Sequence, residues 1–202
     1  MDSYLQLILK GIKPGRKAAG NSAVVAFTSA LPREGVSYVT HSFAMELAKR
    51  TRRQTIIADV NTLQKVDIFH HSRVPRYCCK TDVPYLYVLQ DDAGGPIEEE
   101  NSQQLRPYTT GSEVDQGISN LQTLRYSFDY ILLDCPSMKE SGDAAFYAPA
   151  ADGVVLVVES ERTRKEQVRH ALNTIEMAEA NVLGCVLNKR RYPIPNWIYR
   201  RL

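Results

Sequence analysis

Short apolar runs alternate with longer amphipathic segments along this chain. The runs occupy residues 23–30, 55–60, 85–89, 128–134, 153–159 and 182–188, and they are apolar at almost every position. Runs of this kind are typical of strands that a parallel sheet buries on both faces. Residues 36–51, 112–127 and 163–180 instead repeat apolar residues at helical spacing. The alternation predicts a doubly wound α/β fold, with a mostly parallel sheet and helices on both faces in a three-layer arrangement.

The segments between these runs suggest how the chain is organised. Residues 61–82 have weak periodicity and predict a loop with a short helix, while residues 90–107 are polar and acidic and predict an exposed excursion. No linker splits the central part of the chain. We expect an N-terminal helical segment at 1–20, one domain at 21–188, and a tail at 189–202 that interleaves basic and aromatic residues.

Composition narrows the class of protein. The chain has 202 residues, of which 44% are hydrophobic and 24% are charged, and this balance is typical of one globular domain. A net charge of +2 gives no reason to expect a nucleic-acid partner. No stretch approaches the roughly 18 apolar residues of a membrane span, and the first residues lack the pattern of a signal peptide. We expect a cytoplasmic protein without a membrane span.

The four cysteines have neither zinc-binding nor disulfide spacing. Cys135 and Cys185 lie in apolar runs, so we expect both thiols to pack in the core. Reduced thiols match a cytoplasmic location.

The segment SALPREGVSYVT, residues 29–40, joins a predicted strand to a predicted helix through a loop that contains glycine. This context is typical of a phosphate-binding loop, in which backbone N–H groups at the start of the helix point at an anion. Gly35 would permit close approach of the backbone, and the Ser37 hydroxyl would lie where Mg²⁺ binds. An ordinary turn between a strand and a helix also needs only a glycine, so the loop alone leaves both interpretations open. Its candidate nucleotide-binding residues are Arg33, Glu34, Gly35, Val36, Ser37 and Tyr38.

Two aspartates extend the candidate site. Asp59 ends the run IIAD and Asp134 ends the run ILLD. Ligands of open parallel sheets bind at the carboxyl ends of the strands, so the loop and both aspartates would meet in one crevice. Strand-terminal aspartates are also common helix caps, but the three features in this order favour a nucleotide site. Asp59 and Asp134 are the catalytic candidates, and together with Ser37 they are the candidate Mg²⁺ ligands.

The order of these motifs resembles the cytoplasmic domain of bacterial tyrosine kinases of capsule and exopolysaccharide biosynthesis, relatives of the MinD and ParA ATPases. TSALPREGVS is similar to the Walker A loop of that family, IIADVNTLQ to its second Walker motif, and FDYILLDCPS to its Walker B motif. Residues 141–172 and 182–189 also match in order and spacing, so the resemblance covers almost the whole chain. It implies a P-loop NTPase-like sandwich that takes ATP or ADP with Mg²⁺.

The resemblance also implies roles for single residues. Asp59 would help to activate a hydroxyl nucleophile, and Asp134 would organise the Mg²⁺ ion. Asn188 matches a position that commonly contacts adenine, and Asp143 matches an acidic position just after Walker B.

The chain departs from the family pattern where the chemistry is concentrated. Val36 stands in place of the phosphate-contacting lysine, and Asn61 and Leu63 replace an aspartate and an arginine of the second motif. Loss of the lysine should weaken binding and should impair phosphoryl transfer more, because that reaction depends on positioning and electrostatics. Arg33 and Lys189 are the candidates for a replacement charge.

Two further features of the family are missing. Only Tyr192 and Tyr199 remain where the family has the C-terminal tyrosine cluster that becomes phosphorylated. In the N-terminal DSYLQLILKGI, Leu5 and Ile8 fall where the oligomerisation helix of the family has arginines. The substrate tail and the assembly motif have therefore changed together with the loop.

The leading hypothesis is a degenerate tyrosine-kinase-like protein of exopolysaccharide biosynthesis, regulatory in role, with weak or no phosphoryl transfer. Its partner would be the cytoplasmic part of a membrane polysaccharide chain-length or export protein, through which it would associate with the membrane, and the resemblance allows a homo-oligomer. One alternative is an active ATP-dependent tyrosine kinase or ATPase that uses a substitute cation. Another is an interaction scaffold that binds no nucleotide.

Overall fold

The computed structural model describes residues 22–66, 68, 77–91 and 113–190. The expected N-terminal segment, most of the polar excursion and all but the first two residues of the expected tail lie outside these ranges.

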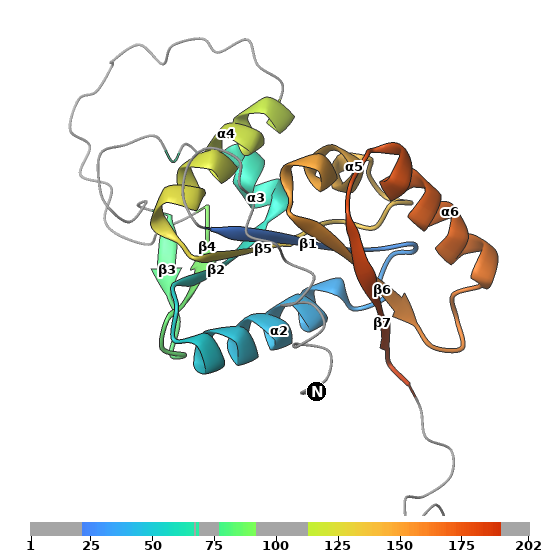
Figure 1. Ribbon diagram of the computed structural model, residues 1–202, viewed down its shortest axis with the longest axis horizontal. Coiled ribbons are helices and arrows are strands. Elements are labelled where there is room, and N and C mark those ends of the chain that lie inside the picture. The colour runs from blue at the N-terminus through green and yellow to red at the C-terminus, as the bar shows by residue number, and fades with distance from the viewer. Residues whose placement is uncertain (1–21, 67, 69–76, 92–112, 191–202) are drawn as a thin grey trace, which may run out of the picture.

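The described residues form a seven-stranded sheet in the order β3-β4-β2-β5-β1-β6-β7 (Figure 1). β3 pairs antiparallel with β4, and the other neighbouring strands are parallel, so the predicted mostly parallel sheet is confirmed. The strands are β1 (Ala23–Ser29), β2 (Thr55–Asp59), β3 (Cys78–Lys80), β4 (Leu86–Leu89), β5 (Tyr130–Asp134), β6 (Gly153–Glu159) and β7 (Val182–Asn188).

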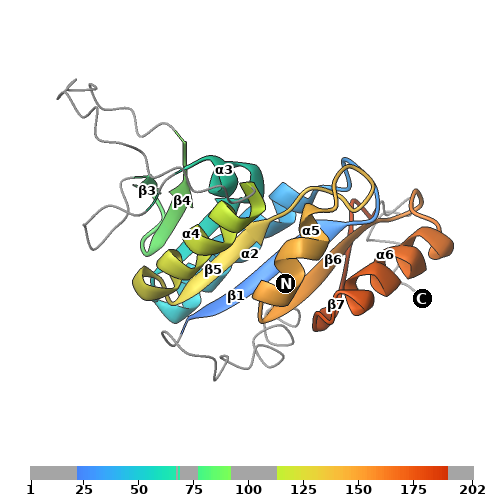
Figure 2. The ribbon, with the colours of Figure 1, turned by 90° about the horizontal axis from the view of Figure 1, so that it is seen from above.

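Helices cover both faces of this sheet. α2 lies on one face, and the other helices lie on the opposite face, which is seen from above in Figure 2. None of the helices in the described ranges is long and apolar enough to cross a membrane. They are α2 (Val36–Thr51), α3 (Val60–Lys65), α4 (Glu113–Ser127), α5 (Asp143–Tyr147), the 3₁₀ turn η1 (Ala148–Ala150) and α6 (Lys165–Met177).

The two helix layers bury both sides of the central strand β1. Val25 and Phe27 pack with Leu47 of α2. Val24 and Ala26 point the other way, into the cluster to which α3, α4, α5 and α6 contribute. All seven residues of β1 are buried, and this explains why the run is apolar at almost every position.

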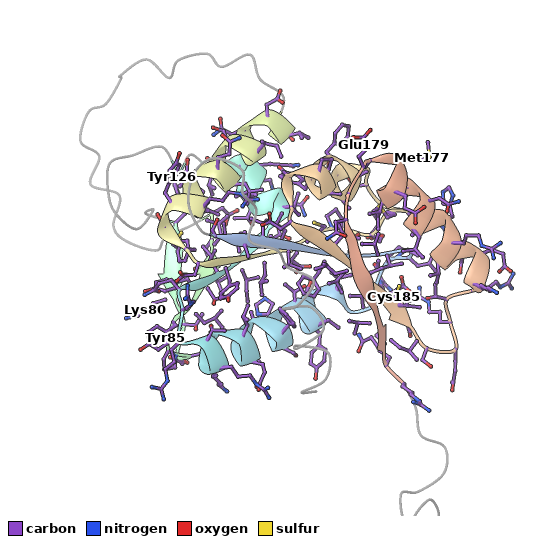
Figure 3. All side chains as sticks on the ribbon, viewed as in Figure 1. Lys80, Tyr85, Tyr126, Met177, Glu179 and Cys185 are labelled. Atoms are coloured by element: carbon purple, nitrogen blue, oxygen red, sulfur yellow. The ribbon has the colours of Figure 1, made fainter. Side chains whose placement is uncertain are left out.

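Two predictions about the edges of the sheet are wrong. The stretch 61–82 contains the predicted short helix as α3, but it also contains β3, whose three residues are too few to give a periodic pattern. Cys185 is exposed on β7 rather than packed in the core, because β7 is an edge strand with half-buried or exposed residues along its length (Figure 3). Cys135 is buried, as predicted.

Candidate functional site

The ends of three parallel strands form the floor of the candidate site. β1 ends at Ser29, β2 at Asp59 and β5 at Asp134. β5 lies between β1 and β2, and Asp59 is the direct partner of Asp134 in the register of the sheet. Ile57 and Leu132, two residues earlier on the same strands, pack on the α2 side. Because side chains alternate along a strand, both aspartates project toward the face that carries α2.

A pocket of about 220 Å³ opens at these strand ends. Two of the predicted site residues are not part of its lining: Tyr38 is 69% exposed, and Asn188 contacts the loop from the end of β7. The pocket brings together the remaining predicted residues, whose binding of a nucleotide stays a prediction. These are Arg33, Glu34, Gly35, Val36, Ser37, Asp59 and Asp134.

The loop between β1 and α2 has the backbone geometry of an anion site. Gly35 has φ 90°, in the left-handed region that favours glycine, and a Cβ there would lie 2.3 Å from Nδ2 of Asn188. The first helical hydrogen bond of α2 runs from the N–H of Val39 to the carbonyl of Gly35. Within the described ranges, the backbone N–H groups of residues 34–38 have no protein acceptor. These N–H groups, at the positive end of a helix dipole, suit a phosphate.

Donors from β7 and from the segment before α6 hold the opposite side of this loop. Arg162 donates from Nη1 to the carbonyl of Pro32 at 3.1 Å, and Lys189 donates from Nζ to the carbonyl of Arg33 at 2.5 Å. Asn188 donates from Nδ2 to the carbonyl of Glu34 at 2.8 Å. Because a trans peptide directs each carbonyl opposite to the following N–H, these contacts turn the N–H groups of residues 33–35 away from the three donors.

The Glu34 side chain supports the loop from inside, a role that sequence reasoning missed. It is fully buried, and its carboxylate accepts the N–H of Leu31 at 2.8 Å and the N–H of Glu159 at 3.0 Å. The hydroxyl of Thr163 donates to the same carboxylate. Because the carboxylate oxygens of Glu34 accept hydrogen bonds from the protein, Glu34 contributes its backbone to the pocket and not its negative charge.

The Asp134 carboxyl lies at the centre of the floor and is only 8% exposed. Burial raises its pKa above the ordinary value of 3.8, and the negative charge of Asp59 adds to the increase. A hydrogen bond with the Ser37 side chain and the nearby His41 act in the opposite direction without cancelling it. A cation bound beside Asp134 would favour the charged form of this carboxyl.

Asp59 caps a helix and also lines the pocket. Its carboxylate accepts the N–H of Thr62 at 2.9 Å and caps α3, so the interpretation as a helix cap is correct. It also lines the pocket beside Asp134 and Ser37. Two carboxylates and a hydroxyl are oxygen donors of the kind that Mg²⁺ prefers, and protein sites for Mg²⁺ often use one or two carboxylates with phosphates of the substrate. The donor set therefore fits Mg²⁺.

Several residues of the pocket wall were not predicted. Most of them follow Asp134 directly in the sequence, and that position after a strand-terminal aspartate was the available signal. The Ser137 hydroxyl donates to the Glu140 carboxylate at 2.7 Å, which fixes this part of the wall. Burial, reinforced by Asp134, Asp59 and Asp143, raises the pKa of the Cys135 thiol and keeps it protonated. The unpredicted lining residues are Ser29, Asn61, Cys135, Pro136, Ser137 and Glu140.

Replacing Asp134 by asparagine should stabilise the nucleotide-free protein. At pH 7 we expect the free energy of unfolding to rise by about 0.5–2 kcal/mol, since the variant removes a buried charge at a functional site. Because the pKa of Asp134 is raised in the folded state, the wild type loses stability as pH increases from 3.8 through that pKa. The difference in unfolding free energy between Asp134→Asn and the wild type should therefore shrink toward acid pH. Urea unfolding of both proteins across this pH range measures the difference. Asp82→Asn, at an exposed position, is the matched control and should change the free energy of unfolding at pH 7 by no more than about 0.5 kcal/mol.

Comparisons with known proteins show which proteins the chain resembles. No family model matches the chain. It is 30% identical over 187 residues to the succinoglycan biosynthesis transport protein ExoP of Rhizobium meliloti, covering 85% of this chain and 23% of ExoP. The chain thus spans less than a quarter of that relative. It is 28% identical over 182 residues to the tyrosine-protein kinase CpsD of Streptococcus agalactiae, covering 82% of this chain and 75% of CpsD.

Solved structures show the same fold. The chimerical protein CapA2B2 superposes with a TM-score of 0.67 at 20% identity, over 95% of this chain and 85% of that one. MinD of the Aquifex aeolicus MinC:MinD complex superposes with a TM-score of 0.59 at 18% identity, over 89% and 72% of the two chains. These likenesses confirm the predicted P-loop NTPase fold. This chain is a homologue of the bacterial tyrosine kinase family, built on the fold that the family shares with MinD.

Proposed function

We propose that this protein is a nucleotide-binding, tyrosine-kinase-like regulator of exopolysaccharide biosynthesis with weak or no phosphoryl transfer. The observation that carries the proposal is Val36, an apolar side chain at the first position of α2, in the wall of a pocket that contains loop N–H groups and two strand-terminal aspartates. Phosphate binding uses the backbone N–H groups, which every residue except proline supplies. Phosphoryl transfer requires oriented positive charge, which valine cannot supply.

Each part of the pocket has a role in this proposal. The loop around Gly35 binds the phosphates of ATP or ADP, and Ser37 with Asp134 holds Mg²⁺. The ion, when bound, neutralises phosphate charge. Asp59 is the direct partner of Asp134 in the register of the sheet and forms part of the same polar floor of the pocket. Asn188, whose amide nitrogen bonds the loop, has its amide oxygen available to accept from the adenine amino group.

The relatives suggest where such a regulator acts. ExoP is named as a biosynthesis transport protein and CpsD as a tyrosine-protein kinase. By analogy, the partner of this chain is the cytoplasmic part of a membrane polysaccharide chain-length or export protein, and the chain works in the cytoplasm beside it. Residues 21–188 would form the nucleotide-binding unit, and 1–20 and 189–202 would be available for assembly.

ATP turnover tests the proposal. Purified protein with Mg-ATP should release ADP far more slowly than the roughly 1–100 s⁻¹ of kinases, while a parallel binding assay shows saturation. Turnover within that range would contradict the regulatory role and would support an active enzyme with a substitute cation. Absence of nucleotide binding would instead support the scaffold without nucleotide.

A further inference from the structure

We propose that the Arg33 guanidinium binds the phosphate chain of the nucleotide, and that it compensates for Val36 in nucleotide binding but not in phosphoryl transfer. This inference rests on the proposed function, because it identifies a phosphate-binding residue of the same pocket. Sequence alone left two candidates for a replacement charge, Arg33 and Lys189. The surroundings of the two side chains differ, and the difference selects Arg33.

Arg33 lies in the pocket wall with an uncommitted charge. It is one of the lining residues and is exposed. Within the described ranges, no carboxylate or carbonyl pairs with its guanidinium. A buried or paired arginine would have to break contacts before it could bind an anion, whereas this one has none to break among the described residues. Its five N–H donors can form two parallel hydrogen bonds to phosphate oxygens.

The backbone of Arg33 is held in an uncommon conformation. Its φ is 64°, in the left-handed region that favours glycine. The bond from Lys189 Nζ to the Arg33 carbonyl, together with the contacts to the carbonyls of Pro32 and Glu34, fixes this stretch of the loop. An arginine that persists at a position suited to glycine indicates that its side chain contributes something that offsets the strain.

Lys189 is committed elsewhere. Its Nζ bonds the Arg33 carbonyl and lies 3.2 Å from the Glu159 carboxylate, which also binds Arg162 at 2.8 Å. Lys189 does not line the pocket. Its charge therefore neutralises Glu159 and steadies the loop from the side opposite the phosphate site. In this arrangement Lys189 is a positioning residue and Arg33 is the phosphate-binding residue.

The test measures the affinity of the full chain for Mg-ATP and Mg-ADP, together with the melting temperature. Arg33→Gly removes the charge and suits the left-handed backbone, so it should melt at the same or a higher temperature than the wild type. Its affinity should nevertheless fall ten- to a hundredfold, as expected for the loss of a charged hydrogen bond to phosphate. A merely structural residue would not lose affinity while gaining thermal stability.

Three matched variants complete the design. Arg33→Lys keeps a cation and should retain most of the affinity. Arg169→Gln removes one positive charge from the exposed surface of α6, outside the pocket, and should leave the affinity unchanged. Lys189→Gln should lower the melting temperature and should reduce affinity less than Arg33→Gly does.

The outcomes separate this inference from the proposed function. If the wild type binds Mg-ATP and Arg33→Gly binds it equally well, the inference is overturned and the proposed function stands. A loss of binding in Lys189→Gln with binding retained in Arg33→Gly would overturn it in favour of the rival cation. If the wild type binds neither nucleotide while folded, the inference and the proposed function fail together.

Discussion

The Val36→Lys variant is expected to bind Mg-ATP ten- to a hundredfold more tightly than the wild type. A charged hydrogen bond to phosphate contributes about 1.5–3 kcal/mol, and about 1.4 kcal/mol is tenfold in affinity. Val36 is half-buried at the first position of α2 and lines the pocket, so the stem of a lysine can follow the apolar surface while its ammonium enters the pocket. Calorimetric titration of both proteins measures the difference.

Without nucleotide, Val36→Lys should be less stable than the wild type. A cation in the first turn of a helix opposes the helix dipole and costs about 0.3–1 kcal/mol, so the empty Val36→Lys protein should melt slightly below the wild type. Saturating Mg-ATP should reverse that order. Tyr38→Lys adds the same charge two residues later, outside the pocket lining, and should show no gain in affinity. Equal affinity of Val36→Lys and wild type would mean that the phosphate chain does not lie beside residue 36.

The Glu34→Ala variant should lose about 2–4 kcal/mol of unfolding free energy, since each donor left without an acceptor costs on the order of 1 kcal/mol. The donors are the N–H groups of Leu31 and Glu159 and the hydroxyl of Thr163. They join the phosphate loop to the end of β6 and to the segment before α6. Loss of the carboxylate should therefore loosen the loop as well as lower stability. Chemical unfolding in urea, without nucleotide, provides the measurement.

Two further variants serve as controls for Glu34→Ala. Glu34→Gln keeps one acceptor oxygen and should lose less than Glu34→Ala does. Glu176→Ala, at an exposed position on α6, should change the unfolding free energy by no more than about 0.5 kcal/mol. A Glu34→Ala protein as stable as the wild type would show that the carboxylate is not the support that its contacts indicate.

The sheet was predictable because its strands are buried on both faces. In β1 both Val24 and Val25 must be apolar, one toward each helix layer, and this produces the continuous apolar run. The edges gave weaker signals. β3 has only three residues, too few for a periodic pattern. β7 is as apolar in sequence as a central strand, yet its Cys185 is exposed to solvent. How far an edge strand is buried depends on the elements packed beside it, and the sequence of the strand itself does not reveal them.

The site was predictable as far as backbone topology determines it. Strand-terminal Asp59 and Asp134 and the loop around Gly35 meet because parallel strands end at one edge of the sheet. The contacts of Glu34 were not predictable, since Glu159 and Thr163 approach it across more than a hundred residues of chain. For the same reason, sequence could not separate Arg33 from Lys189 as a replacement cation. The carbonyl and carboxylate that engage Lys189 become apparent only in the folded protein.

Under the proposed function, the pocket binds nucleotide but transfers phosphoryl groups weakly or not at all. The loop N–H groups proposed to bind phosphate depend on backbone geometry that Gly35 and the carbonyl contacts of the loop maintain. The charge that stabilises a transferring phosphoryl group depends on one side chain, and Val36 does not provide it. A protein of this kind can report the nucleotide state to a partner without consuming the nucleotide.

A calorimetric titration of the wild-type protein with Mg-ADP and Mg-ATP measures directly whether the pocket binds nucleotide. It should be made at two temperatures, so that an enthalpy near zero at one of them does not hide binding. We expect saturable binding of both nucleotides at one site per chain, without turnover of ATP during the titration. A folded protein that binds neither nucleotide at either temperature would contradict this expectation, and the function would then reside on the surface of the fold.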